Sequence, residues 1–374
     1  MKVLFIAHFR EGTGWSHAAI DYALAMDSIG IDVVCRNVDL TGRMADVPTK
    51  IKELENKTTQ GCDFCIQNVL PHHLVGSGKF KKNIAIFFGE SENLWTTNWF
   101  VFLQQMDEVW VSNPDLCHSL FDSRFLIDHN KIEVVPCPFD PEKLTKKTPK
   151  ISMPGRDHQF KFYYIGELND RKNIASIIRS FHAEFDTSEQ VALILKVKKF
   201  GQSPEQTHNE VKSMCENIKT SLRMYQSLEN YHQEIIISDD MSDDGILALH
   251  RYGDCFVSAS HGEGWSIPAF DAMCLGKTPI CSNSGGPSSF IDPSDKNTGT
   301  LINGVYSVCR HGDPAFPDIF TGREEWFVPS ESEIKSAMRH YFSENQTGLL
   351  PTIPIDLKFS YNAIGDRIKD LLNE

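Results

Sequence analysis

The chain has 374 residues, of which 41% are hydrophobic and 23% are charged, so it is long enough for two globular domains of roughly 180 residues each. Its 37 basic and 50 acidic residues give a net charge of −13, which argues against nucleic acid as a partner and against strong adhesion to an anionic membrane. No apolar run approaches the roughly 20 residues of a membrane span, so we expect at most peripheral membrane contact.

The start of the chain and its cysteines indicate a cellular compartment. The opening sequence MKVLFIAHF has one lysine and a short apolar run, which is typical of a first strand rather than a signal peptide. Ten cysteines are spread through predicted core strands, as in proteins of a reducing compartment. Cys62 and Cys65 form a C-x-x-C pair, but no second pair stands at a zinc-finger spacing. We therefore expect a cytoplasmic protein with no metal or redox site at these cysteines.

The first elements form a β–loop–α–β unit. Residues 2–7 are predicted as a buried strand, followed by a glycine loop at 12–15, a helix at 16–28 and a strand at 31–35. Gly14 lies in this loop, which is a candidate phosphate cradle. Two glycines after a strand often serve only the turn, so both interpretations stay open on this evidence.

Polar residues follow the next two predicted strands. Residues 62–73 contain a strand and end in Pro-His-His, and another strand ends just before Glu90 and Glu92. Ligands of α/β proteins gather at the carboxyl ends of parallel strands, so His72 or His73 is a candidate ligand contact. A loop histidine bonded to backbone is the alternative, and the two glutamates are either ligand contacts or solvated loop acids.

The second half of the chain begins after a linker. Residues 143–158 are rich in Lys, Thr, Pro and Gly, and beyond them apolar runs again alternate with helical patterns. The predicted strands are 160–165, 191–197, 235–237 and 255–260, and the predicted helices are 173–185, 205–225, 332–342 and 361–372. This alternation predicts an α/β protein with two doubly wound, Rossmann-like parallel sheets that face each other across a cleft. Residues 292–328 are predicted as an irregular surface excursion because they are rich in Gly, Pro, Asp and Thr.

An acidic stretch at residues 238–244, S-D-D-M-S-D-D, resembles a metal-binding D-x-D pattern. A helical pattern follows at once, so Ser242 as its N-cap, with Asp243 and Asp244 in the first turn, accounts for the acids without a metal. We therefore predict no metal ligands here.

Residues 261–275, HGEGWSIPAFDAMCL, are predicted as a strand end, a glycine turn and a helix start. Gly262 and Gly264 let the backbone approach a ligand closely, and Pro268 suits a first helical turn. The backbone N–H groups at the positive end of this helix form a candidate site for an anion such as phosphate. These groups belong to Trp265, Ser266 and Ile267. An ordinary turn of an α/β protein is the alternative.

The wider pattern E-G-W-S-I-P-A-F-D-A-M-x-x-G-K-T-P-I-x-x-x-x-G-G resembles the donor-site signature of the retaining family-4 glycosyltransferases (glycosyl transferases group 1). That signature has Glu, seven residues and Glu, then A-M-A-x-G-x-P-V and Gly-Gly. Glu263 takes the first acidic place, and Asp271 takes the second with a shorter reach than the usual Glu. The resemblance implies that Glu263 holds hydroxyls of the donor sugar, Asp271 holds the ribose, and the N–H groups of Gly264 to Ile267 bind phosphate or sugar.

The resemblance covers both halves of the chain, including D-E-V-W-V at 107–111 and V-V-P at 134–136. Residues 166–173 resemble the family's G-x-x-x-x-[basic]-K-N/G block, which implies that Arg171 and Lys172 bind the nucleotide diphosphate. Such cations would stabilise the charge that develops on the leaving group. An exposed Arg-Lys pair at a helix start is the alternative, and Glu167 departs from the arginine that many relatives have. The resemblance further implies roles for Gly14 at the donor phosphate, for backbone near Met241 at the nucleobase, and for His72 or His73 at a sugar.

The residues and the resemblance together predict a GT-B fold. It has an N-terminal acceptor domain at 1–145, a C-terminal donor domain at 159–355, and a last helix within 356–374 that crosses back to the first domain. The predicted enzyme is a retaining, metal-independent hexosyltransferase that uses a GDP-mannose or UDP-glucose type of donor and no cofactor. Its acceptor is a glycan, a lipid-linked sugar or a protein, and Glu263 and His72 are the predicted catalytic residues. The alternatives are a non-catalytic sugar-nucleotide-binding protein and a GT-B-fold epimerase or phosphorylase.

Overall fold

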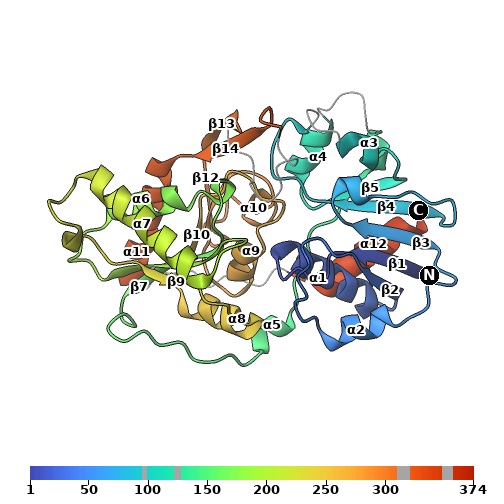
Figure 1. Cartoon of the computed structure of the whole chain (residues 1–374), viewed down its shortest axis with the longest axis horizontal. Helices are drawn as coiled ribbons and strands as arrows, with labels where there is room; N and C mark the ends of the chain where they lie inside the picture. Colours follow the sequence, from blue (N-terminus) through green and yellow to red (C-terminus); the bar gives the residue numbers. More distant parts are fainter. Residues whose placement is uncertain (95–98, 122–127, 310–320, 348–356) are drawn as a thin grey trace. The chain divides into compact units, whose positions relative to one another are not determined.

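The computed structural model describes residues 1–94, 99–121, 128–309, 321–347 and 357–374 of the chain. These residues form two compact units, which Figure 1 colours along the sequence. Unit 1 comprises Met1–Glu142, Gly264–Ile267 and Asp356–Glu374, and unit 2 comprises Lys143–Glu263 and Pro268–Ile355. The domain boundary predicted between residues 355 and 356 falls outside the described residues.

The strands that the structure describes in unit 1 form one parallel sheet in the order β2-β1-β3-β4-β5-β6. Their bounds are β1 Lys2–Ala7, β2 Asp32–Asn37, β3 Phe64–Asn68, β4 Lys82–Phe87, β5 Glu108–Val111 and β6 Ile132–Val134. The strand predicted at residues 2–7 is confirmed, and its Val3, Phe5 and Ala7 are fully buried. Strands that are covered on both faces are expected to be continuous apolar runs, so the apolar run at residues 2–7 was enough to predict this strand.

The helices described in unit 1 are α1 Gly14–Ser28, α2 Thr49–Glu55, α3 Trp99–Leu103, α4 Pro114–Phe121 and α12 Tyr361–Asn373. In Figure 1 the red α12 lies beside the blue α1, so the two ends of the chain pack together. The approach is close because residue 365 is glycine: a Cβ there would lie 2.5 Å from the carbonyl oxygen of Ala25. The Tyr361 hydroxyl also donates to the Asp21 carboxylate at 2.6 Å.

The main sheet of unit 2 is parallel in the order β12-β11-β10-β7-β8-β9. Its strands are β7 Phe160–Glu167, β8 Val191–Lys198, β9 Ile235–Ile237, β10 Cys255–Ser258, β11 Ile280–Ser282 and β12 Thr300–Ile302. Numbered within the unit, this order is 3-2-1-4-5-6, the order of a dinucleotide-binding sheet. The direction of winding reverses between β7 and β10, so the loops after these two strands border the crevice where such sheets bind ligands.

The helices described in unit 2 are α5 Glu142–Thr145, α6 Ile174–Glu184, α7 Pro204–Leu222, α8 Asp243–Tyr252, α9 Ile267–Cys274, α10 Pro287–Phe290 and α11 Glu331–Thr347. The first residues of α5 and α9 belong to unit 1. Ser242 caps α8 as predicted, since its Oγ accepts from the Gly245 N–H at 3.2 Å. No helix in the described ranges is long and apolar enough to cross a membrane.

The prediction that residues 292–328 are irregular is wrong in part. Within them β12 (Thr300–Ile302) completes one edge of the main sheet, and β13 (Gly304–Val308) pairs antiparallel with β14 (Glu325–Pro329). Residues 310–320 of the same segment lie outside the described residues. The strands were missed because β12 has only three residues and its pairing partner, β11, is not adjacent to it in sequence, whereas β13 is exposed throughout, so its apolar residues do not alternate between a buried and an exposed face.

Three charged or titratable side chains meet in the interior of unit 2. Glu234 accepts hydrogen bonds from His182 and from Lys219, the latter at 2.8 Å, and all three residues are buried or nearly so. Burial opposes ionisation of Glu234, but the hydrogen bond from His182 and the charge of Lys219 lower its pKa to about 2. This cluster ties α6, α7 and the start of β9 together.

Candidate functional site

The loops after β7 and β10 bring Arg171, Lys172 and Glu263 together at the point where the sheet of unit 2 reverses direction. The Lys172 amino group lies 2.7 Å and 2.8 Å from the two carboxylate oxygens of Glu263. Arg171 lies 3.5 Å from the same carboxylate and donates to the Gly262 carbonyl at 2.6 Å. The residues predicted for the diphosphate and for the sugar are therefore neighbours, and in this structure they neutralise one another in part.

The carboxylate of Glu263 is ionised inside the protein. Only 8% of its side chain is exposed, and the side chains of Lys172 and Arg171 are 17% and 13% exposed. Burial alone would raise the pKa of Glu263, but the charges of Lys172 and Arg171 outweigh burial and lower it. Two cations and one carboxylate leave the cluster with a net charge of about +1, which favours binding of an anion.

The local sequence holds the Arg-Lys loop in a defined shape. The Asn169 side chain accepts from the Lys172 N–H at 3.0 Å, and Asn173 adopts a left-handed conformation (φ 47°) that ends this turn and begins α6. Asn tolerates that conformation better than most residues. The Asn173 side chain then donates to the Ala259 carbonyl at 3.0 Å, and the His261 N–H donates to the Arg171 carbonyl at 2.7 Å. The two loops are thus joined by hydrogen bonds.

The Gly-Gly pair of the motif holds the backbone of Glu263. The Gly286 N–H donates to the Glu263 carbonyl at 3.0 Å. Gly285 has a φ of +68°, and a Cβ there would clash with the same carbonyl oxygen. Only glycine fits this position without a shift of the backbone, which explains why a Gly-Gly pair accompanies the acidic residue.

The turn that follows Glu263 is tightly held. The Gly264 carbonyl accepts from Ser112 Oγ at 2.6 Å and from Asn113 Nδ2 at 2.8 Å, while the Trp265 ring is buried against Phe359. Ser266 has a φ of +68°, a conformation that is uncommon for serine and is a mark of functional turns. The role of the N–H groups of Gly264 to Ile267 in anion binding stays a prediction.

Asp271 lies on α9 and is bound by Lys143 from the start of the linker. The Lys143 amino group is 3.1 Å and 3.2 Å from the two carboxylate oxygens, and only 14% of the Asp271 side chain is exposed. Arg251 fixes the linker by donating to the carbonyls of Lys143 at 2.9 Å and of Lys146 at 2.6 Å. The contact with Lys143 could not be predicted from the sequence, because the partners are 128 residues apart.

Met241 lies directly before α8, and its side chain packs near Gly245 at the start of that helix. Two acidic residues near Met241 form ion pairs with lysines: Asp244 pairs with Lys146 at 2.5 Å, and Asp240 pairs with Lys198. Within the described ranges, no group of three or more His, Cys, Asp or Glu side chains is arranged to hold a metal ion. The absence of a metal requirement remains a prediction.

The remaining predicted residues lie in unit 1. Gly14 is the first residue of α1, and His72 and His73 follow β3 as an exposed pair whose rings are 4.1 Å apart. The sheet of unit 1 reverses direction between β1 and β3, so the histidines lie at the ligand-binding edge of this sheet as well. Glu92 accepts from Ser119 and supports α4. Sequence reasoning missed His8, which directly follows β1 at the same edge.

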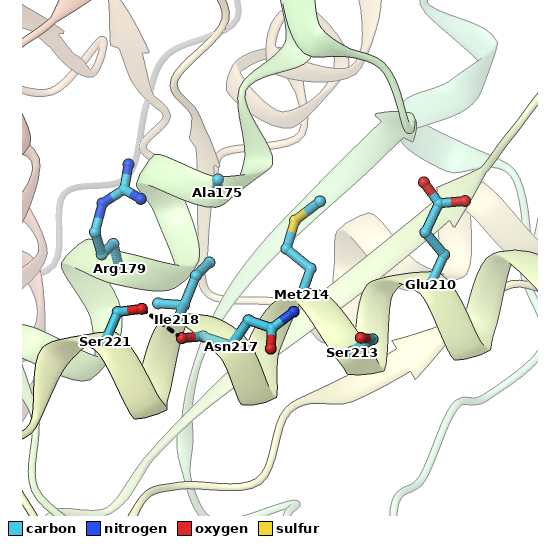
Figure 2. A pocket seen from close by; sticks show the side chains of 8 residues that line it. All are labelled: Ala175, Arg179, Glu210, Ser213, Met214, Asn217, Ile218 and Ser221. Carbon is cyan, nitrogen blue, oxygen red and sulfur yellow. Dashed lines mark hydrogen bonds between the residues drawn. The ribbon is translucent and has the colours of Figure 1, made fainter.

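A groove of about 490 Å³ lies between α6 and α7 of unit 2 (Figure 2), and Glu263 is not among its lining residues. It is lined by Ala175, Arg179, Glu210, Ser213, Met214, Asn217, Ile218 and Ser221. Its two charged residues are already engaged, Arg179 with Glu331 and Glu210 with Lys199. The groove therefore has no excess of positive charge for a diphosphate, whereas two cations and one carboxylate give the loop cluster a net charge of about +1, so the cluster is the better candidate.

Comparison with known proteins finds a sequence family that matches part of the chain. Residues 150–305 match the sequence model of the family described as "Glycosyl transferases group 1", a range that includes the Arg-Lys loop, Glu263 and the Gly-Gly pair. None of the curated protein sequences matches the chain.

Several solved structures share the fold over their whole length. The Anabaena protein HepE in complex with UDP has a TM-score of 0.68 and 14% identity, with 100% of both chains covered. Sucrose-phosphate synthase from Thermosynechococcus elongatus has a TM-score of 0.65 and 12% identity, covering 100% of this chain and 98% of that chain. The lipopolysaccharide outer core galactosyltransferase WaaB has a TM-score of 0.60 and 14% identity, covering 100% and 99%. The two parallel sheets with flanking helices thus form a GT-B fold, and the predicted fold class is confirmed.

Proposed function

We propose that the protein transfers a hexose from a nucleoside-diphosphate sugar to an acceptor hydroxyl, since residues 150–305 match the family model described as "Glycosyl transferases group 1". We further propose that the anomeric configuration is retained. The first donors to consider are UDP-glucose and GDP-mannose, and HepE, whose structure was solved with UDP-glucose, supports the former. The acceptor is a glycan, a lipid-linked sugar or a protein.

The observation that carries this proposal is the cluster of Arg171, Lys172 and Glu263 at the carboxyl edge of the unit 2 sheet. A sugar transfer from such a donor needs cations for the departing diphosphate and a group that recognises the sugar. Both are within one salt-bridged cluster here. In the donor complex, the diphosphate replaces Glu263 as the partner of Lys172, and the released carboxylate accepts hydrogen bonds from the sugar hydroxyls.

The other proposed roles follow from position. Asp271 binds the ribose: a carboxylate has lone pairs enough to accept from the ribose and from Lys143 together. Backbone near Met241 contacts the base, the N–H groups of Gly264 to Ile267 contact phosphate or sugar, and Gly14 contacts the donor phosphate. His72 contacts a sugar near the reacting bond.

We propose that no metal or organic cofactor takes part, because Arg171 and Lys172 supply the positive charge that a metal would otherwise supply. We place the reaction in the cytoplasm. The structure pairs none of the ten cysteines in a disulfide, as is usual in a reducing compartment.

The test is turnover with defined donors. The protein is incubated with UDP-glucose, UDP-galactose and GDP-mannose, with and without simple sugars as acceptors, and released nucleotide and free sugar are measured. We expect one donor to release its nucleotide, and NMR of the product to show the anomer of the donor. If a donor binds calorimetrically and no nucleotide is ever released, the protein is a sugar-nucleotide-binding protein. Binding of neither donors nor nucleotides would refute the proposal.

A further inference from the structure

The buried His8 presents a hydrogen-bond acceptor that no described residue uses. It follows β1, at the edge where the unit 1 sheet reverses direction, and its side chain is 0% exposed. Its Nδ1 lies 2.8 Å from the Val38 carbonyl oxygen. A carbonyl only accepts, so Nδ1 carries the proton of this bond. Burial lowers the pKa of His8, so the ring is neutral at pH 7 and Nε2 keeps a free lone pair.

A donor without a partner lies beside this acceptor. Trp15 stands in the turn that opens α1, and its ring is 5.5 Å from the His8 ring, edge to face. Its Nε1 is buried and, like His8 Nε2, has no hydrogen-bond partner within the described ranges. Leaving such a group unsatisfied costs about 1–3 kcal/mol, so native proteins rarely keep two side by side without a ligand or water.

The neighbouring groups limit what the ligand is. His73 is exposed, and its ring is 6.1 Å from that of His8, so the pair borders the surface. Among the neighbouring titratable groups, the acids Glu11 and Asp39 raise the pKa of His8, and His72 lowers it. This environment disfavours an anion such as phosphate. A hydroxyl group both donates and accepts, so it satisfies Nε2 of His8 and Nε1 of Trp15 at once.

We propose that His8 and Trp15 form a binding site for a hydroxyl group of a neutral sugar, in which the hydroxyl donates to His8 Nε2 and accepts from Trp15 Nε1. This inference rests on the proposed function, in which such a sugar is the acceptor. His8 and Trp15 then determine acceptor specificity, while the donor is held by unit 2. Because His8 also anchors β1 to the segment after β2 through Val38, it is positioned rigidly for this contact.

Two substitutions separate binding from folding. Trp15→Phe keeps the ring and removes the N–H group, and His8→Asn keeps a donor for the Val38 carbonyl and removes Nε2. Because the removed groups have no partner in the free protein, neither change should lower the melting temperature through a lost hydrogen bond. Trp110→Phe is the control at another tryptophan: Trp110 is fully buried, whereas Trp15 is half-buried, and the Nε1 of Trp110 donates to Glu108 at 2.9 Å. It should destabilise the chain and leave sugar binding alone.

The experiment is saturation-transfer NMR of the full chain with glucose, mannose and galactose, and with inorganic phosphate as the anionic probe. We expect at least one sugar to bind the wild type and Trp110→Phe, with at least tenfold weaker binding to Trp15→Phe and His8→Asn and no binding of phosphate at this site. Nitrogen-15 spectra of His8 should show Nε2 shifting on addition of that sugar. A shift typical of a hydrogen-bonded Nε2 that no sugar changes would mean a structural water, and would overturn the proposal.

Measurements of donor turnover distinguish the proposed hydroxyl site from the proposed function. Hydrolysis of the donor in the absence of an acceptor should be unchanged in Trp15→Phe, and the KM for the acceptor sugar should rise at least tenfold at unchanged KM for the donor. Normal donor turnover with unaltered acceptor KM in both variants would reject the hydroxyl site and leave the proposed function standing. Absence of any donor binding would reject the proposed function instead.

Discussion

Substitution of Glu263 by glutamine should make the protein less stable and yet a better binder of free nucleotide. The change keeps the volume of the side chain and removes the charge that faces Lys172 and Arg171. Both cations then remain in a largely buried site without their anion. A bound diphosphate is the group that restores the balance.

The magnitudes follow from the geometry. Removing one partner of a buried ion pair lowers the free energy of unfolding by about 3–5 kcal/mol. Because the Gln carbonyl can still accept a hydrogen bond from Lys172, we expect Glu263→Gln to cost about 3 kcal/mol, at the lower end of this range. A phosphate charge roughly 6 Å from the carboxylate is repelled by about 3 kcal/mol at an effective dielectric constant of about 20. Salt and the two cations reduce this repulsion, so we expect a gain of at least about 1.4 kcal/mol, which is tenfold in the affinity for UDP or GDP.

Thermal unfolding and calorimetric titration measure both effects. Without nucleotide, Glu263→Gln should have a lower melting temperature than wild type. Addition of the nucleotide that the enzyme uses should raise the melting temperature of Glu263→Gln more than that of wild type. Donor turnover should fall, because the sugar loses its carboxylate. Glu331→Gln is the control: Glu331 pairs with Arg179, but their side chains are 36% and 41% exposed, so little stability and no nucleotide affinity should change. An unchanged or weaker nucleotide affinity in Glu263→Gln would refute the competition between carboxylate and diphosphate.

The remaining predictions concern other charges. Lys172→Ala should weaken binding of UDP or GDP at least tenfold and leave binding of the nucleoside almost unchanged, as calorimetry can show, since a point charge is lost. Asp271→Asn should weaken nucleoside and nucleotide alike, by about 1.5–3 kcal/mol, whereas Lys143→Met should not, because Asp271 keeps its charge; equal losses in both variants would contradict the ribose assignment. Activity should survive excess EDTA, and a loss that Mg²⁺ reverses would show that a metal is required. The pKa of Glu234 is about 2 when folded and about 4.3 in an unfolded chain, so the stability that its ionisation provides is present above pH ~4.3 and is lost as the pH falls toward 2. Unfolding free energies of Glu234→Gln should therefore be lower at pH 7 and depend less on pH between 4.3 and 2 than those of wild type.

Most strands could be predicted because their residues are apolar and buried from both faces. The three residues of β9, Ile235–Ile237, were found from their apolar run alone, although this edge strand is only half-buried. The same reasoning fails for β12 and for the β13–β14 hairpin, whose pairing is set by partners outside the local sequence. Local composition predicts an element only when the element's own residues supply most of its burial.

The site shows the same division between local and distant information. The motif around Glu263 and the block around Lys172 predicted two halves of a donor site, and their placement at the ends of β7 and β10 follows from strand order. The sequence did not predict that these halves pair with each other, nor that Lys143 binds Asp271. From the sequence, His8 could be recognised only as a histidine after a strand. Its Nε2 is the unused nitrogen because Nδ1 donates to the carbonyl of Val38, which follows a different strand.

The pairing of Lys172 with Glu263 has a consequence for the order of events under the proposed function. A donor that carries its sugar satisfies both members of the pair, because the diphosphate takes Lys172 and the sugar hydroxyls take Glu263. The nucleotide product takes Lys172 alone and leaves the buried Glu263 carboxylate with Arg171, 3.5 Å away, as its remaining cation, which is costly. Re-formation of the ion pair between Lys172 and Glu263 therefore competes more strongly with binding of the nucleotide product than with binding of the donor. The same two side chains that recognise the donor thereby favour release of the nucleotide after transfer, and this preference should disappear in Glu263→Gln.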